Sequence, residues 1–241
     1  LSELGSAIAR TGRGVTAGVG SLPTEIRLTE LPPLVDGRPV LGIADETLAP
    51  VGFEPSGVLL LAGPPASGRS TALASLVASL ERAIPGVARY YIGNSRSALA
   101  TRPGWTDSAV SIEAAAELAK TVTPLVKEAG AETRIVVFIE GIADFLSTPA
   151  DAPLVELIKT VRRSDQLLIA ESDTGQWGSS WPLLSEVKAA RTGFLLQPDA
   201  LEGEMLLKTA LPRVTRAEFP PGRGFFIARG KAQRVQLPLA E

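Results

Sequence analysis

Residues 57–70 of the chain read GVLLLAGPPASGRS. The apolar run breaks at Gly63, a glycine-containing turn follows, and an apolar-periodic stretch begins at Ser70 and continues to Ala83. This order predicts a buried strand over 57–62, a tight turn and then a helix. The turn matches the phosphate-binding pattern G-x-x-x-x-G-K-[ST] except at one fixed position, because Arg69 stands where the pattern has lysine.

This turn predicts a site for the phosphates of a nucleotide. Gly63 permits the tight turn, Gly68 lets the backbone approach the phosphates, and the following helix N-terminus favours an anion. Ser70 offers a hydroxyl to magnesium and Thr71 offers one to the α-phosphate. The expected contacts are Gly63, Pro64, Pro65, Ala66, Ser67, Gly68, Arg69, Ser70 and Thr71. The alternative is a strand-to-helix turn that binds nothing.

Two positions argue against rapid ATP hydrolysis. Arginine is bulkier than lysine and forked, so Arg69 can hold phosphate without reproducing the placement of a lysine. The apolar stretch 135–139 ends in Glu140, an acid that can orient magnesium, although a solvated strand-end acid is the alternative. The next residue is Gly141, where a hydrolytic site needs a carboxylate that polarises water. We therefore expect nucleotide binding with slow or absent turnover.

Composition narrows the chemistry further. The 241 residues include no cysteine and no histidine, which excludes disulfides, thiolate chemistry, histidine bases and the usual zinc ligands. With 24 basic and 26 acidic residues the net charge is −2, so we expect no nucleic-acid partner. No apolar run approaches the ~20 residues that cross a bilayer, so we expect no membrane contact. Because Leu1 is not methionine, we expect a piece of a longer protein.

The pattern along the chain predicts one α/β domain behind a connector. Residues 1–34 are rich in glycine and proline and form the expected N-terminal connector, and residues 35–241 form the domain. Near-continuous apolar strands that alternate with helices predict a mainly parallel sheet with helices on both faces. Residues 224–229 and 232–237 predict a C-terminal β-hairpin. The other expected strands are 88–92, 134–139, 166–170 and 192–196, and the other expected helices are 111–129, 153–163 and 181–190.

Three further segments allow more than one interpretation. Residues 171–174 follow a strand and either sense the terminal phosphate or form a polar loop. Trp177 and Trp181 are a stacking platform for bases, core anchors or a protein contact. The segment 219–226 reads FPPGRGFF and either closes over a nucleotide or turns the chain into its last hairpin.

With both nucleotide motifs placed, the chain resembles FtsK/SpoIIIE-type P-loop ATPases, a RecA/FtsK-like fold. It is most similar to the C-terminal ATPase domain of EccC, the motor of type VII secretion systems. The resemblance covers about residues 25–241 and rests on motif spacing. In active members the second motif ends in Asp-Glu-x-x-Asp, of which only Asp144 is unchanged here. More specific are SSWPLL at 179–184, RTGFLLQPD at 191–199 and FPPGRG at 219–224.

The resemblance implies ATP as the ligand, with Mg²⁺ held by Ser70 and Glu140. It implies neighbouring ATPase domains in the same chain, assembly into a hexamer, and a WXG-type secreted substrate recognised through its C-terminal signal peptide. It places the domain in the cytoplasm, as part of a membrane-associated motor. Downstream domains of such motors tend to have degenerate nucleotide motifs. The alternatives are an active ATPase that translocates DNA or protein, and a substrate-docking module whose phosphate loop is vestigial.

Overall fold

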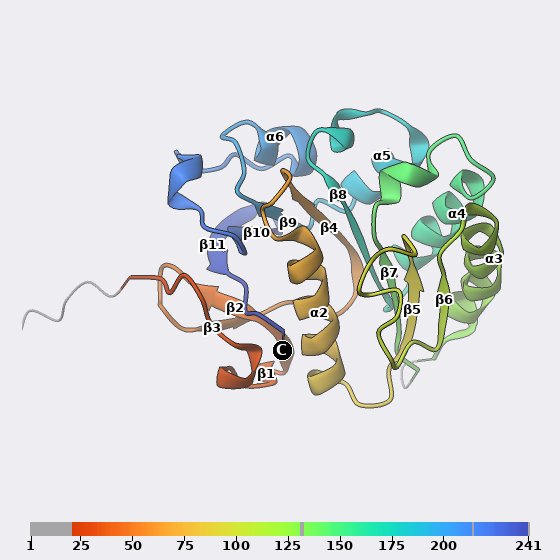
Figure 1. The fold of residues 1–241 in the computed structure, drawn as a ribbon, viewed down its shortest axis with the longest axis horizontal. Coiled ribbons are helices and arrows are strands. Elements are labelled where there is room, and N and C mark those ends of the chain that lie inside the picture. The colour runs from red at the N-terminus through yellow and green to blue at the C-terminus, as the bar shows by residue number, and fades with distance from the viewer. Residues whose placement is uncertain (1–20, 131–132, 214, 241) are drawn as a thin grey trace, which may run out of the picture.

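A single eleven-stranded sheet forms the middle of the molecule in the computed structural model, which describes residues 21–130, 133–213 and 215–240 (Figure 1). Its order is β1-β2-β11-β10-β9-β4-β8-β7-β5-β6, and β3 pairs with β2. The strands are β1 Leu34–Val35, β2 Arg38–Ala44, β3 Pro50–Gly52, β4 Gly57–Gly63, β5 Ala88–Ile92, β6 Asp107–Ala109, β7 Ile135–Ile139, β8 Leu167–Asp173, β9 Gly193–Leu196, β10 Arg223–Ala228 and β11 Lys231–Gln236.

The sheet has a parallel half and an antiparallel half. Strands β9, β4, β8, β7, β5 and β6 run parallel, and β10, β11, β2, β3 and β1 add antiparallel pairs. The expected hairpin is confirmed as β10 and β11, which pair from Arg223 with Gln236 to Ala228 with Lys231. The expected parallel sheet is confirmed around β4, so the phosphate loop leaves the sheet between β9 and β8.

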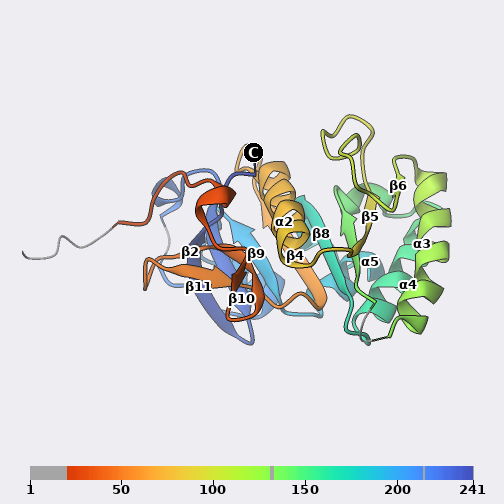
Figure 2. The same cartoon turned by 90° about the horizontal axis from the view of Figure 1, so that it is seen from below.

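Helices cover both faces of the sheet, as expected (Figure 2). The helix α2 covers one face, whereas α3, α4, α5 and α6 pack into the core on the other. The helices are α2 Arg69–Ala83, α3 Ile112–Glu128, α4 Asp151–Val161, α5 Pro182–Lys188 and α6 Glu202–Leu207. Short 3-10 turns occur at η1 Leu28–Glu30, η2 Ile142–Phe145, η3 Gln176–Gly178 and η4 Arg216–Glu218.

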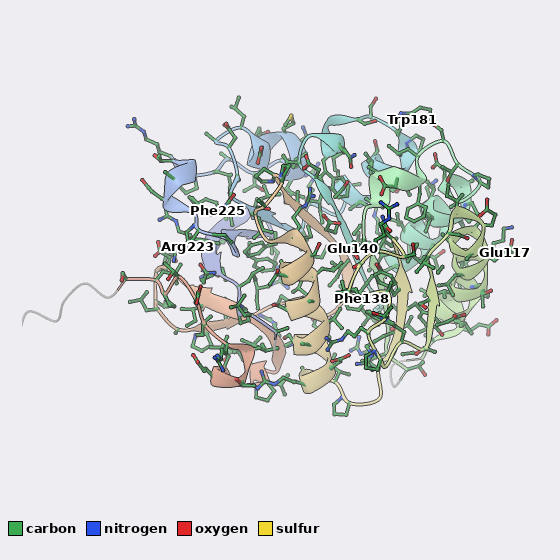
Figure 3. All side chains as sticks on the ribbon, viewed as in Figure 1. Glu117, Phe138, Glu140, Trp181, Arg223 and Phe225 are labelled. Atoms are coloured by element: carbon green, nitrogen blue, oxygen red, sulfur yellow. The ribbon has the colours of Figure 1, made fainter. Side chains whose placement is uncertain are left out.

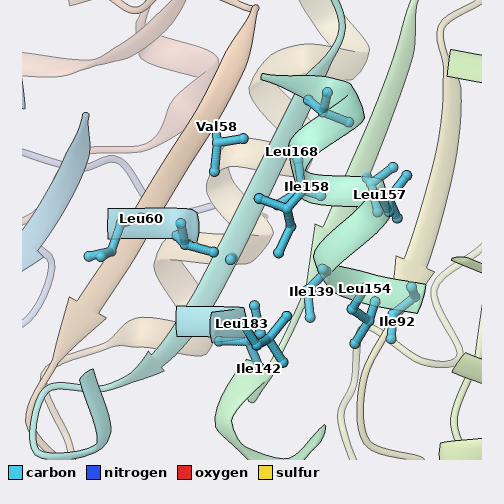
Figure 4. Packing of buried hydrophobic residues seen from close by; sticks show 14 of the residues in the cluster. Val58, Leu60, Ile92, Ile139, Ile142, Leu154, Leu157, Ile158, Leu168 and Leu183 are labelled. Carbon is cyan, nitrogen blue, oxygen red and sulfur yellow. The ribbon is translucent and has the colours of Figure 1, made fainter. Parts of the chain in front are cut away.

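The strand β4 shows why the parallel strands read as unbroken apolar runs. Leu59 and Leu61 pack in the cluster beneath α2, whereas Val58 and Leu60 pack in the cluster that includes Ile158 of α4 (Figure 4). All four of these β4 side chains are buried. A strand covered on both faces buries every side chain, so alternation disappears from its sequence.

The strand β8 continues three residues beyond the range 166–170 expected from its apolar run. Pairing with β4 persists through Ala62 with Ser172 and Gly63 with Asp173. Backbone pairing therefore extends past the last apolar residue, which sequence patterning does not register. The extension brings Glu171 and Asp173 beside the phosphate loop.

The described part of the N-terminal segment packs on the domain. Leu22, Leu28 and Leu31 are buried, and the Leu28 N–H donates to the carbonyl of Leu239 over 2.9 Å. Residues 1–20 of the expected connector lie outside the described residues. Among the residues that the structure describes, no helix combines the length and apolarity that crossing a membrane requires.

Candidate nucleotide-binding site

The phosphate loop joins β4 to α2 through two glycines that no other residue replaces without strain. Gly68 has φ +91°, in the left-handed region, and a Cβ there would lie 3.3 Å from the Gly222 nitrogen. A Cβ on Gly63 would lie 2.4 Å from the Ser67 Oγ. The first turn of α2 has no side-chain cap, so its leading N–H groups are available to an anion.

Ser67 lies at the base of this loop with an unsatisfied hydroxyl. The residue is buried, and its Oγ has no hydrogen-bond partner in the part of the chain that the structure describes. Its backbone is fixed on both sides, since its N–H donates to the Pro64 carbonyl and its carbonyl accepts from the Gly222 N–H over 3.1 Å. A buried polar atom without a partner is unusual, and this one lies against Gly63.

Arg69 is held by acids of the neighbouring strand β8. Its Nε lies 2.9 Å from Glu171 Oε1, and its Nη1 lies 2.9 Å from Asp173 Oδ2. The same Nη1 donates to the Gly63 carbonyl over 2.9 Å. A lysine has one compact charge and cannot make this forked set of contacts. The arginine is therefore part of an ion-pair network within the protein.

Glu171 is the most buried acid of this network. It is 4% exposed, and its Oε2 accepts from the Gly141 N–H over 3.0 Å. Burial raises the pKa of the Glu171 carboxyl, and the charges of Glu140 and Asp144 raise it further; the Gly141 N–H and Arg69 lower it. Four carboxylates therefore gather at the ends of β7 and β8, with Asp173 as the fourth.

Glu140 is placed by two hydroxyls. Its Oε1 accepts from Ser70 Oγ over 3.2 Å, and its Oε2 accepts from the Tyr91 hydroxyl over 2.6 Å. Burial, together with this hydrogen bond, raises the pKa of Tyr91, which keeps the phenol protonated as a donor. In the described residues, no group of three or more acidic side chains is arranged to hold a metal ion. Ser70 and Glu140 fit Mg²⁺ only together with phosphate oxygens, which is its usual mode.

Gly141 has a conformation that suits glycine rather than glutamate. Its φ is +67°, and a Cβ there would lie 2.8 Å from Asp144 Oδ2. L residues rarely adopt this backbone shape. Placing a carboxylate at this position would therefore strain the main chain.

A largely apolar cavity of about 190 Å³ adjoins the other side of the loop. Gly68, Thr71 and Ala72 form its wall on the loop side. The opposite walls come from segments far apart in sequence: Thr24 and Glu25, Pro220 to Gly222, and Gln236 to Leu239. Sites for whole ligands measure about 300–1,000 Å³, so this volume suits the base rather than an entire nucleotide.

Arg223 ties these walls together. Its Nη2 donates to the carbonyls of Leu22 and Pro23 over 3.0 and 2.8 Å, and its Nε donates to Gln236 Oε1 over 3.1 Å. Burial lowers the pKa of its guanidinium. In Figure 3, Arg223 and Glu140 lie on either side of the N-terminal end of α2. The cavity is thus on the Arg223 side and the acids are on the Glu140 side.

The structure brings most of the residues expected at the site together. Ser67 to Thr71 surround the start of α2, and Glu140 reaches Ser70. Pro65 and Ala66 are exposed on the loop. Residues 220–222 lie against the loop, whereas Trp177 is fully buried and therefore unable to stack on a base. Trp181 is half exposed.

Sequence reasoning missed the roles of Tyr91, Arg223 and the Thr24–Glu25 wall. Tyr91 belongs to an apolar strand, so its sequence context predicts a core residue. Arg223 lies within the FPPGRG segment, where a single cation between two glycines is a usable signal. Thr24 and Glu25 offer no signal, because their importance comes only from the packing of the chain ends.

Solved structures with this architecture include ATPases. The cytoplasmic domain of the type VII secretion ATPase EccC from Thermomonospora curvata matches with a TM-score of 0.72 and 24% identity, over 91% of this chain and 28% of that chain. EccC ATPases 2 and 3 from the same organism, in complex with a signal sequence peptide, match with a TM-score of 0.72 and 23% identity, over 91% and 44%. This chain has the fold of the EccC ATPase domains.

More distant structures extend the comparison. The pCW3 conjugation coupling protein TcpA with ATPγS matches with a TM-score of 0.66 and 16% identity, over 92% of this chain and 72% of that chain. No family model and no curated protein matches the sequence. The chain spans less than half of the two EccC chains. The structural similarity establishes the P-loop ATPase fold that the sequence predicts. Because the identities are below 25%, it establishes the fold alone.

Proposed function

We propose that this chain is a nucleotide-binding domain of a type VII secretion motor, with an ATPase fold and slow or absent hydrolysis. One observation carries the binding proposal: the phosphate loop opens directly onto an apolar cavity, whose wall on that side is formed by Gly68, Thr71 and Ala72. Phosphates would bind the loop and an adenine base would fill the cavity. The TcpA structure contains ATPγS, which supports an adenine nucleotide as the ligand.

Arg69 and Gly141 support the weak activity. Arg69 is paired with two acids of β8, and Gly141 has no side chain to polarise water. The rival proposal of an active translocating ATPase predicts steady-state hydrolysis that Ser70→Ala abolishes. Turnover equal to that of Ser70→Ala would exclude it.

A charge placed beside the loop tests nucleotide binding. Thr71 is exposed and lies in the first turn of α2, where a glutamate favours the helix but repels phosphate. In thermal melting, ADP or ATP, each with Mg²⁺, should raise the melting temperature of the natural protein. A ligand at 1,000 times its Kd adds ~4.1 kcal/mol to the free energy of unfolding. Thr71→Glu should remove the shift. The control is Thr121→Glu on α3, which adds the same charge at the edge of the sheet.

Failure of both nucleotides to shift the melting temperature of the natural protein would contradict the proposal. It would favour the alternative in which the loop is vestigial and the domain only docks a partner. That alternative also predicts peptide binding that is independent of nucleotide.

The substrate proposal rests on the fold. The EccC structure contains a signal sequence peptide, and we infer that this domain also contacts the C-terminal signal peptide of a WXG-type substrate and neighbouring ATPase domains in a hexameric motor. Leu201 and Met205 at α6 are exposed apolar side chains available to a partner. A calorimetric titration with such a peptide, with and without bound nucleotide, tests this. No heat in either titration would contradict it.

A further inference from the structure

The cation of the loop is already neutralised within the protein. In a phosphate loop this position normally sends its charge to the β- and γ-phosphates. Here the Arg69 guanidinium lies 2.9 Å from oxygens of both Glu171 and Asp173, and its side chain is only 23% exposed. A third phosphate would therefore have to share a guanidinium whose charge is already offset by two carboxylates. Drawing Arg69 away from them would leave Glu171 as a buried charge without its cation, which is costly.

Further carboxylates lie close to Glu171. Glu140 reaches Ser70, Gly141 binds Glu171, and the charges of Glu140 and Asp144 both act on Glu171. Glu171 and Asp173 thus pair with the one guanidinium, and Glu140 and Asp144 add two further carboxylates near Glu171. A γ-phosphate would bring further negative charge into this region, where burial weakens screening.

The position of a β-phosphate is different. The backbone N–H groups at the start of α2 and the loop cradle bind it without the Arg69 side chain. A ligand that ends at its second phosphate therefore uses these backbone N–H groups and avoids the acids at the ends of β7 and β8.

We propose that this loop selects a nucleoside diphosphate over a nucleoside triphosphate, because the Arg69–Glu171–Asp173 network closes the position of the third phosphate. This rests on the proposed nucleotide-binding function and specifies the ligand of that site. The network makes the bound diphosphate a fixed part of the domain rather than the product of a turnover.

Calorimetric titrations with ADP and with a non-hydrolysable ATP analogue test the preference. Both contain the same Mg²⁺ concentration, since magnesium at Ser70 and Glu140 offsets part of the negative charge. We expect ADP to bind at least about tenfold more tightly than the ATP analogue. Asp173→Asn removes one acid and loosens Arg69, and Glu171→Gln removes the other. Each should reduce the preference for ADP, mainly by improving the affinity for the analogue.

The matched control removes two acids elsewhere. Glu117→Gln with Glu156→Gln removes exposed partners of Lys120 and Lys127 on α3, and should leave the ADP preference unchanged. Equal affinities, or tighter binding of the analogue by the natural protein, would overturn the inference and leave the nucleotide-binding function intact. Absence of binding by both ligands would overturn the function and the inference together. A preference unaffected by Asp173→Asn and Glu171→Gln would overturn the role of the network.

Discussion

The two sides of the α2 N-terminus are built on arginines with opposite kinds of partner. On the cavity side, Arg223 donates to the carbonyls of Leu22 and Pro23, so it fastens backbone segments. On the acid side, Arg69 is paired with the carboxylates of Glu171 and Asp173. Neutral carbonyl partners fix the segments and leave the charge of Arg223 in place, whereas carboxylate partners offset the charge of Arg69, which a phosphate would otherwise meet. Under the proposed function, nucleotide binding depends on the cavity side and hydrolysis on the acid side.

The largest expected effect is on the cavity side. Arg223→Met leaves the carbonyls of Leu22 and Pro23 without their charged donor and releases Gln236. We expect the free energy of unfolding to fall by about 3 kcal/mol, since hydrogen bonds to charged groups contribute about 1.5–3 kcal/mol each and solvent compensates in part. Chemical denaturation measures this, and calorimetry with ADP should show weaker binding.

The control for Arg223→Met is Arg229→Met, at the exposed turn of the same hairpin. It removes the same charge and should change the unfolding free energy by less than about 0.5 kcal/mol. Equal losses in the two variants would show that Arg223 does not hold the cavity wall.

Arg69→Lys is expected to have a smaller effect on stability and little effect on turnover. A lysine cannot bind Glu171, Asp173 and the Gly63 carbonyl together, so the unfolding free energy should fall by about 1–2 kcal/mol. Steady-state hydrolysis should stay slow, because Gly141 still lacks the carboxylate that polarises water. Arg163→Lys, at the exposed end of α4, is the control. Brisk turnover in the single variant would show that Gly141 is not limiting.

The sequence predicts the acid side better than the cavity side. The acid side is built largely from continuous motifs, whereas the cavity side depends on contacts between residues far apart in the sequence. Gly63 to Thr71 form one continuous motif, and the apolar run before Glu140 marks its strand, so pattern and period suffice. The partners of Arg69 lie one strand away, and only the β4–β8 register places them. The cavity wall joins Thr24 to residues 220–222 and 236–239, and such contacts between chain ends leave no local pattern.

The smallest expected difference is between the unfolding free energies of Gly141→Ala and a control glycine variant. It tests whether the backbone at position 141 accepts a side chain. Gly141→Ala should lower the unfolding free energy by about 1–2 kcal/mol, the cost of an L residue in the left-handed region. Gly86→Ala is the matched control, since Gly86 has φ +80° and nothing lies within 4 Å of its Cβ position. The two losses should agree within about 0.5 kcal/mol, because Asp144 Oδ2 is the end of a flexible side chain and can move.

A larger loss in Gly141→Ala than in Gly86→Ala would mean that Asp144 is fixed and that the site resists any side chain here. In that case Arg69→Lys combined with Gly141→Glu should remain slow, although both residues of an active site are present. Rapid hydrolysis by the double variant would instead show that two side chains alone separate this domain from a motor. These variants therefore distinguish a site that lacks only two side chains from a site whose backbone also excludes a side chain at position 141.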